Sequence, residues 1–155
     1  MSTPHDILLG AAAGLAATGP MTAVMKALHT QLPPGEQYPL PPRQITMNVA
    51  RTAGVEPVRE SDRKALTIAS HFAYGAACGA LYAGVADRLP GHPVAKGIGF
   101  GLAVWAGSYL GWLPAAGLLS PATEHPARRN ALMIAAHVVW GATAGAAYSR
   151  MAEEA

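Results

Sequence analysis

The sequence predicts an all-α, polytopic membrane protein of four short transmembrane helices, and three observations lead to that prediction. Apolar residues make up 51% of the 155 residues, and charged residues only 13%. Four long stretches carry almost no charge, and each is long enough for a helix to cross a bilayer core of roughly 30 Å. The third observation is an internal repeat that relates two of these stretches.

The predicted spans lie in one domain of residues 1–155, and they cover about 7–28, 65–86, 95–113 and 130–149. A soluble helix would show a polar stripe every 3.6 residues. Ala65–Val85 and Ala131–Tyr148 are instead apolar or small on every face. The first stretch could be a signal peptide, but Met1–Asp6 contains no Lys or Arg, so we expect it to be retained.

The repeat is the most specific pattern. ALTIASHFAYGAACGALY, starting at Ala65, matches ALMIAAHVVWGATAGAAY, starting at Ala131, at ten of 18 positions with a constant offset of 66. The other two spans resemble each other more weakly, through the stretches that begin at Gly10 and Gly97. The predicted unit is therefore a helical hairpin present in two parallel copies, which makes the second and fourth helices symmetry mates.

Each span carries two glycines four residues apart, the small-xxx-small pattern that lets membrane helices approach closely. We expect these glycines to form the helix contacts of a four-helix bundle. They are Gly10, Gly14, Gly75, Gly79, Gly97, Gly101, Gly141 and Gly145.

Residues 31–64 form the one sizeable predicted extramembrane segment. Pro42 is well placed to begin a short helix, and Gly54 to end it. Ile45, Val49 and Ala53 fall at intervals of four, so the helix is amphipathic. It is expected to lie at the membrane interface, and docking of a partner is the alternative.

The distribution of Lys and Arg predicts the orientation. Eight lie on the side that holds residues 26–64 and 128–129, and three on the side that holds both termini. The positive-inside rule then places both termini outside the cytoplasm.

Two histidines lie inside the spans, where ionisable residues are rare and often functional. His71 and His137 occupy equivalent positions of the repeat, and Tyr82 and Tyr148 lie on the same helix faces eleven residues later. Both imidazoles should therefore face the interior at the same depth.

Three interpretations of the pair remain open. Each histidine could hydrogen-bond a neighbouring helix, near Thr18, Gly19, Thr22 or Ser108. The pair and Tyr82, Tyr148, Tyr109 and Trp105 could line a polar pocket for a small ligand or a proton. The two imidazoles could also ligate the iron of a b-type haem, with Arg63, Lys64, Arg128 and Arg129 available for its propionates.

The sequence offers no support for an enzyme. No carboxylate lies in a span interior, and no Ser or Cys has a plausible base nearby. The single cysteine, Cys78, excludes a disulfide within the chain and a Cys-based metal site, and we expect no bound metal apart from the haem alternative. The net charge of +2 does not suggest nucleic acid as a partner.

Pro-Leu-Pro-Pro-Arg at residues 39–43, Ala-His-Val-Val-Trp at 136–140 and the helix count together resemble the YagU-like family of small bacterial inner-membrane proteins. That resemblance implies a multi-pass protein of the bacterial inner membrane, and it implies no catalytic residues. The leading hypothesis is a non-enzymatic accessory or interaction subunit with a His/Tyr-lined interior face. Its partners would be the lipid bilayer and either another membrane protein or further copies of itself. A haem-binding redox protein and a small transporter or channel are the alternatives.

Overall fold

The computed structural model describes residues 3–55 and 57–155, and within them it contains helices and no strands. The all-helical class is therefore confirmed. The four long helices are α1 (Pro4–His29), α3 (Glu60–Ala86), α4 (Pro93–Ala106) and α6 (Ala127–Glu153). The shorter α2 (Pro41–Thr52) and two single 3₁₀ turns, η1 (Pro34–Glu36) and η3 (Ala122–Glu124), lie in the connections.

Two of the described helices, α1 and α6, are long and apolar enough to cross a membrane. The predicted spans 7–28 and 130–149 lie inside them. The predicted span 65–86 lies inside α3, whose first turns are charged and whose middle carries several polar side chains. The predicted span 95–113 is not one regular α-helix, because α4 ends at Ala106.

Local sequence explains where the helices begin. The hydroxyl of Thr3 accepts a hydrogen bond from the amide of Asp6, and the Asp6 carboxylate accepts one from the amide of Thr3. This reciprocal pair satisfies backbone donors that the first turn of α1 leaves free. At α4 the imidazole of His92 accepts from the amide of Val94, and Pro93 supplies a first residue that needs no partner for an amide hydrogen.

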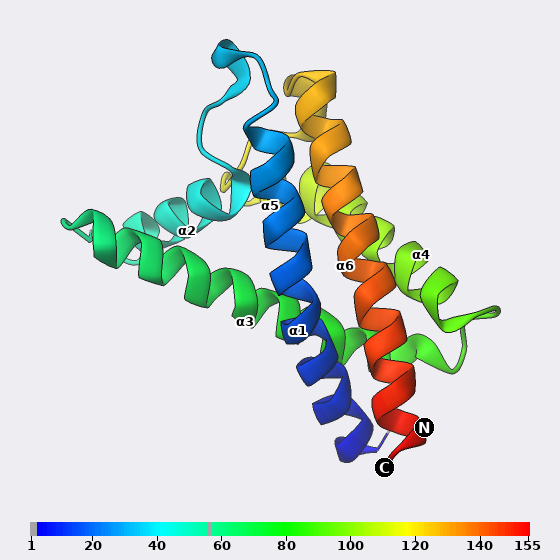
Figure 1. The fold of residues 1–155 in the computed structure, drawn as a ribbon. Coiled ribbons are helices and arrows are strands. Elements are labelled where there is room, and N and C mark those ends of the chain that lie inside the picture. The colour runs from blue at the N-terminus through cyan, green and yellow to red at the C-terminus, as the bar shows by residue number, and fades with distance from the viewer. Residues whose placement is uncertain (1–2, 56) are drawn as a thin grey trace.

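The long helices pack in pairs around a central couple. Figure 1 shows α1 and α6 running side by side in opposite directions, so that both chain ends lie at the same end of the molecule. The most extensive contacts are those of α4 with α6, of α1 with α3, and of α1 with α6. Two buried clusters result, a larger one that includes Met25, Leu113 and Trp140, and a smaller one around Tyr82 and Tyr148.

Glycines form the closest contacts inside each pair. A Cβ built on Gly14 would overlap the carbonyl oxygen of Gly75 and lie 2.7 Å from the Cα of Gly79. A Cβ built on Gly97 would overlap the carbonyl oxygen of Gly141 and lie 2.9 Å from the Cα of Gly145. Only residues without a side chain allow the backbones of α1 and α3, and of α4 and α6, to come so near.

These contacts change one detail of the sequence comparison. The backbone of Gly79 meets the carbonyl oxygen of Gly10, and that of Gly145 meets the carbonyl oxygen of Pro93. Gly97 therefore occupies in the α4–α6 contact the position that Gly14 occupies in the α1–α3 contact. The sequence alignment had paired Gly97 with Gly10, which lies one helical turn earlier. The reason is that the contact needs a small residue only where Cα atoms meet, so the glycine-for-glycine match of α1 with α4 was misleading.

A distorted segment separates α4 from α5 (Leu113–Ala115). Residues 107–112 form a π-helical stretch, η2 (Gly107–Trp112), in which Gly111 departs from helical geometry with φ −116° and ψ −106°. Pro114, which has no amide hydrogen to donate within a helix, follows this distortion within one turn. The wider turn brings Ser108 and Tyr109 to buried positions.

One arginine anchors the loop between α1 and α2. The guanidinium of Arg129 donates to the carbonyl oxygens of Glu36 (2.7 Å), Tyr38 (3.0 Å) and Pro39 (3.1 Å). It also lies 3.5 Å from the centre of the Tyr38 ring, a cation–π contact. Arg129 is 4% exposed, so this residue, expected as a loop charge or a propionate ligand, is a buried structural anchor.

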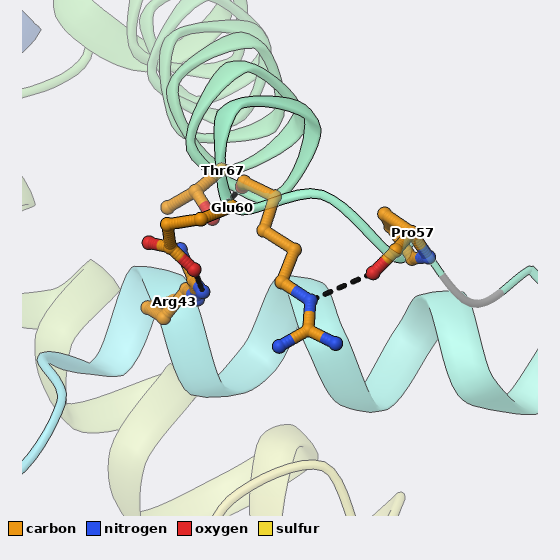
Figure 2. A network of polar contacts seen from close by, with 5 residues as sticks. Arg43, Pro57, Glu60 and Thr67 are labelled. Atoms are coloured by element: carbon orange, nitrogen blue, oxygen red, sulfur yellow. Dashed lines mark hydrogen bonds and ion pairs between the residues drawn. The ribbon is translucent and has the colours of Figure 1, made fainter.

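The short helix predicted within residues 31–64 corresponds to α2, which begins within one residue of the expected position. Gly54, with φ +72°, follows its last turn, as the sequence indicates. Figure 2 shows the contacts that join α2 and Pro57 to the first turns of α3. Arg43 donates to both carboxylate oxygens of Glu60 (3.1 and 2.7 Å), which holds the pKa of that carboxyl below its ordinary value. Arg63 donates to the carbonyl oxygen of Pro57 at 2.7 Å.

Candidate functional site

A cavity of about 430 Å³ lies where α2, α3 and the π segment meet α1 and α6. Its lining is mostly apolar, with a few hydroxyl and imidazole groups. The lining residues are Met21, Pro42, Ile45, Thr46, Val49, Ala50, Ala53, Val55, Leu66, Ser70, His71, Tyr74, Ser108, Tyr109, Trp112, Leu113 and His137. We call this cavity the histidine pocket.

Both histidines that lie inside predicted spans line this pocket. His71 comes from the middle of α3, and His137 comes from the matching position of α6. The two helices are not among the most extensively packed pairs, and both histidines line the same cavity. The structure thus brings together the two residues that the repeat makes equivalent.

The imidazole of His137 is fixed by its own helix. Its Nδ1 lies 2.7 Å from the carbonyl oxygen of Met133, one turn earlier in α6. A carbonyl oxygen only accepts hydrogen bonds, so Nδ1 carries the hydrogen. In the neutral ring Nε2 then has an unshared pair and acts as an acceptor. The expectation of a bond to a neighbouring helix is not met at this nitrogen.

His71 presents an unpaired nitrogen. Its Nε2 is buried and has no hydrogen-bond partner among the described residues. Leaving a buried polar atom unpaired costs about 1–3 kcal/mol, so native proteins rarely keep one without a reason. The ring of the neighbouring Phe72 lies edge to face with this imidazole, with ring centroids 6.3 Å apart.

Two pairs of hydroxyl groups complete the polar part of the lining. The Tyr74 hydroxyl lies 2.9 Å from that of Ser108 and joins α3 to the π segment. The Thr46 hydroxyl lies 2.6 Å from that of Ser70 and joins α2 to α3. One hydroxyl of the Tyr74–Ser108 pair donates to the other, so the second hydroxyl hydrogen remains available for another acceptor. The Ser70 hydroxyl also lies 3.2 Å from the carbonyl oxygen of Thr67, to which it donates while Thr46 donates to Ser70.

Tyr82 and Tyr148, which the sequence grouped with the histidines, lie outside the pocket. Their rings meet edge to face with centroids 5.7 Å apart, and Phe100 packs against Tyr82 at 5.4 Å. Both tyrosines are nearly buried in the smaller core cluster. Eleven residues separate them from the histidines, about 16 Å along a helix, which places them beyond the reach of one cavity.

Tyr109 and Trp105 differ in their position relative to the pocket. Tyr109 lines the pocket and contacts the His137 ring edge to face at 5.8 Å. Trp105 stacks on Tyr109 at 6.3 Å from outside the lining, and its indole nitrogen is buried without a partner among the described residues. Of the four aromatic residues expected around the histidines, one lies at the pocket.

The sequence did not predict the role of α2. Pro42, Ile45, Val49 and Ala53 all line the pocket, so the apolar stripe expected against lipid headgroups forms one pocket wall. The stripe was visible in the sequence, but the surface against which it packs was not, because periodicity within one helix does not show that α2 contacts α3. No group of three or more His, Cys, Asp or Glu side chains suited to a metal occurs in residues 3–55 and 57–155.

The model of a family described as "Family of unknown function (DUF6789)" matches residues 4–155. The chain belongs to the DUF6789 family. The match shows an uncharacterised family, and it does not extend to the YagU-like name, which stays a prediction. No curated protein and no solved structure matches this DUF6789 chain.

Proposed function

We propose that this DUF6789 protein is a non-enzymatic integral membrane protein whose histidine pocket binds a small, largely apolar molecule. In this proposal four helices, α1, α3, α4 with η2, and α6, cross the bilayer as two parallel hairpins. The two apolar helices α1 and α6 and the glycine contacts in each pair support that arrangement.

The proposed location is a bacterial inner membrane, with both termini outside the cytoplasm and α2 at the cytoplasmic interface. Both ends of the chain lie at one end of the molecule in Figure 1, as an even number of crossings requires. The excess of Lys and Arg near residues 43–64 and 128–129 supports the orientation. A C-terminal alkaline phosphatase fusion should be active, and activity of a cytoplasmic reporter at the same position would overturn the orientation.

The observation that carries the binding proposal is the unpaired Nε2 of His71 beside His137 in one cavity. Ligand pockets combine a mostly apolar wall with a few convergent polar groups, and this pocket has that composition. The absence of a carboxylate among the described lining residues favours an uncharged ligand over a cation. The proposed role is that of an accessory subunit that holds such a molecule, alone, as an oligomer or with another membrane protein.

A tryptophan at the pocket wall should weaken this binding. Ala53 lines the pocket and is exposed, so Ala53→Trp fills the cavity from its mouth without disturbing the core. Thr52 is also exposed but lies outside the lining, so Thr52→Trp is the matched control. We expect saturable binding of radiolabelled naphthalene to wild-type protein in nanodiscs, and about tenfold weaker binding to Ala53→Trp.

Protein-free nanodiscs provide the background for this titration, because naphthalene also partitions into lipid. Thr52→Trp should bind as the wild type does. Naphthalene uptake no greater than that of empty nanodiscs would contradict the proposal, as would equal losses in both tryptophan variants.

Haem b is the second candidate, favoured by the two imidazoles that face one cavity. The guanidinium of Arg129 is already occupied by three carbonyl oxygens, so propionates would have to use Arg63, Lys64 or Arg128. A Soret band in the purified protein that disappears in His71→Gln or His137→Gln would establish this function. A colourless protein that still binds naphthalene would eliminate it. A transporter is third, and it would require a water-filled path to the histidines.

A further inference from the structure

Four structural features restrict the chemistry of a ligand in the histidine pocket and its route to the pocket. This inference rests on the proposed binding function. The four features are the fixed tautomer of His137, the unpaired nitrogen of His71, the apolar wall of the pocket, and its exposed apolar rim. We propose that the pocket takes an uncharged, membrane-dissolved molecule with a hydroxyl group, such as an apolar alcohol or phenol, which enters sideways from the lipid.

The need for a hydroxyl follows from His137. Its Nδ1 hydrogen is used by the Met133 carbonyl, and no described residue forms a hydrogen bond to its Nε2. The ring is 5% exposed, and burying a charge without a partner is costly, so the imidazole is neutral. A neutral ring bonded in this way offers only an acceptor to the cavity. A ligand ether or ester oxygen cannot use it, whereas a hydroxyl hydrogen can.

His71 strengthens the same conclusion from the other wall. Its buried Nε2 has no partner, and both histidines line the same pocket. A ligand hydroxyl group that donates its hydrogen to His137 also has an oxygen that accepts from His71 when that imidazole carries its hydrogen on Nε2. The Tyr74–Ser108 pair lies on the same lining and can supply a further hydrogen. A hydroxyl group is the smallest ligand group that satisfies both donors and acceptors.

The sideways route follows from the rim. Val55, Val49 and Trp112 line the pocket and are 55%, 46% and 46% exposed. Exposed apolar groups gathered around one opening are stable against lipid and unfavourable against water. The second groove along α2 is lined by Arg43, Arg51 and Arg63, and Val55 is the lining residue that it shares with the histidine pocket, so the arginines of α2 lie in the neighbouring groove and not on the rim. A charged, water-borne ligand would meet the apolar rim first.

The test compares two molecules of nearly the same shape. 1-Naphthol has a hydroxyl hydrogen, and 1-methoxynaphthalene has none. In nanodiscs, after correction for partitioning into empty discs, wild-type protein should bind 1-naphthol about three- to tenfold more tightly, the range expected for one buried hydrogen bond. His137→Phe should bind both compounds equally and keep its affinity for naphthalene. His137→Gln, which restores an acceptor, should recover part of the preference.

The outcomes separate this inference from the proposed function. Binding of naphthalene with no preference between naphthol and methoxynaphthalene would overturn the hydroxyl requirement and leave the pocket itself in place. Failure of all three aromatic probes would contradict the pocket. If His137→Phe does not fold, the preference of the wild-type protein for 1-naphthol over 1-methoxynaphthalene still tests the hydroxyl requirement.

The route has its own measurement. Leu66 lies on the lining at 37% exposure, and Cys78 is the single native cysteine, so Leu66→Cys in a Cys78→Ala background can carry one fluorescent label. Lipids with a nitroxide near the headgroup should quench this label more strongly than aqueous iodide does. Stronger quenching by iodide would show an opening to water and overturn the sideways route.

Discussion

Replacing Gly97 or Gly101 by alanine is expected to break the contact between α4 and α6, whereas Gly99→Ala in the same helix should leave it intact. A Cβ on Gly101 would lie 2.5 Å from the carbonyl oxygen of His137, and one on Gly97 would overlap that of Gly141. Backbone atoms cannot move aside as a flexible side chain can. No atom lies within 4 Å of a Cβ on Gly99.

The expected cost of either substitution is about 1–3 kcal/mol, the usual range for overpacking a close contact. Gly99→Ala should be neutral or stabilise by up to about 1 kcal/mol, since alanine favours helix more than glycine does. Unfolding of the purified proteins in mixed micelles by increasing fractions of denaturing detergent measures these differences. Equal stability of all three variants would show that α4 and α6 do not approach as described.

Replacing Arg129 by alanine is expected to release the 30–40 loop and to lower stability by about 3 kcal/mol or more, because hydrogen bonds to a charged group contribute about 1.5–3 kcal/mol each where they are buried. Three carbonyl oxygens and the Tyr38 ring would lose their common partner. Arg129→Lys should restore only part of the loss, since an ammonium group lacks the planar fork that reaches all three oxygens.

Arg128 is the matched control, because it is adjacent and equally charged. Its side chain is 70% exposed, and its contact with Glu36 is 3.9 Å long. Surface pairs of this kind contribute about 0–1 kcal/mol, so Arg128→Ala should behave nearly as the wild type. Amide hydrogen exchange of residues 31–40 measures the release directly. Unchanged protection in Arg129→Ala, or equal loss in both variants, would contradict the anchoring role.

Periodicity and composition predicted the helices well, because they depend on local properties of the chain. Charge-free stretches gave the extents of α1 and α6, and Pro42 and Gly54 gave α2 to within a residue or two. The repeat also drew attention to His71 and His137, and both line the histidine pocket. These features need no knowledge of which helix touches which.

Contacts between distant segments could not be predicted in the same way. Tyr82 and Tyr148 share a helix face with the histidines. Such a face extends over several turns, and the cavity reaches the turns that carry the histidines but not those that carry the tyrosines. The π segment depends on the combined effect of Gly107, Gly111 and Pro114, and it decides that Ser108 and Tyr109 face inward. Arg129 follows Arg128 at the start of α6, and nothing in the sequence distinguishes the buried arginine from the exposed one, so only its three carbonyl partners reveal that it is buried.

The most direct test of the central claim is a nuclear magnetic resonance spectrum of protein labelled with ¹⁵N in its histidine rings, recorded in nanodiscs with and without naphthalene. The His71→Gln and His137→Gln variants assign the two pocket signals. If both imidazoles face one binding pocket, naphthalene shifts the signals of His71 and His137 together and leaves that of His92, which caps α4, in place. A shift at only one of the two rings, or at neither, would contradict a shared pocket.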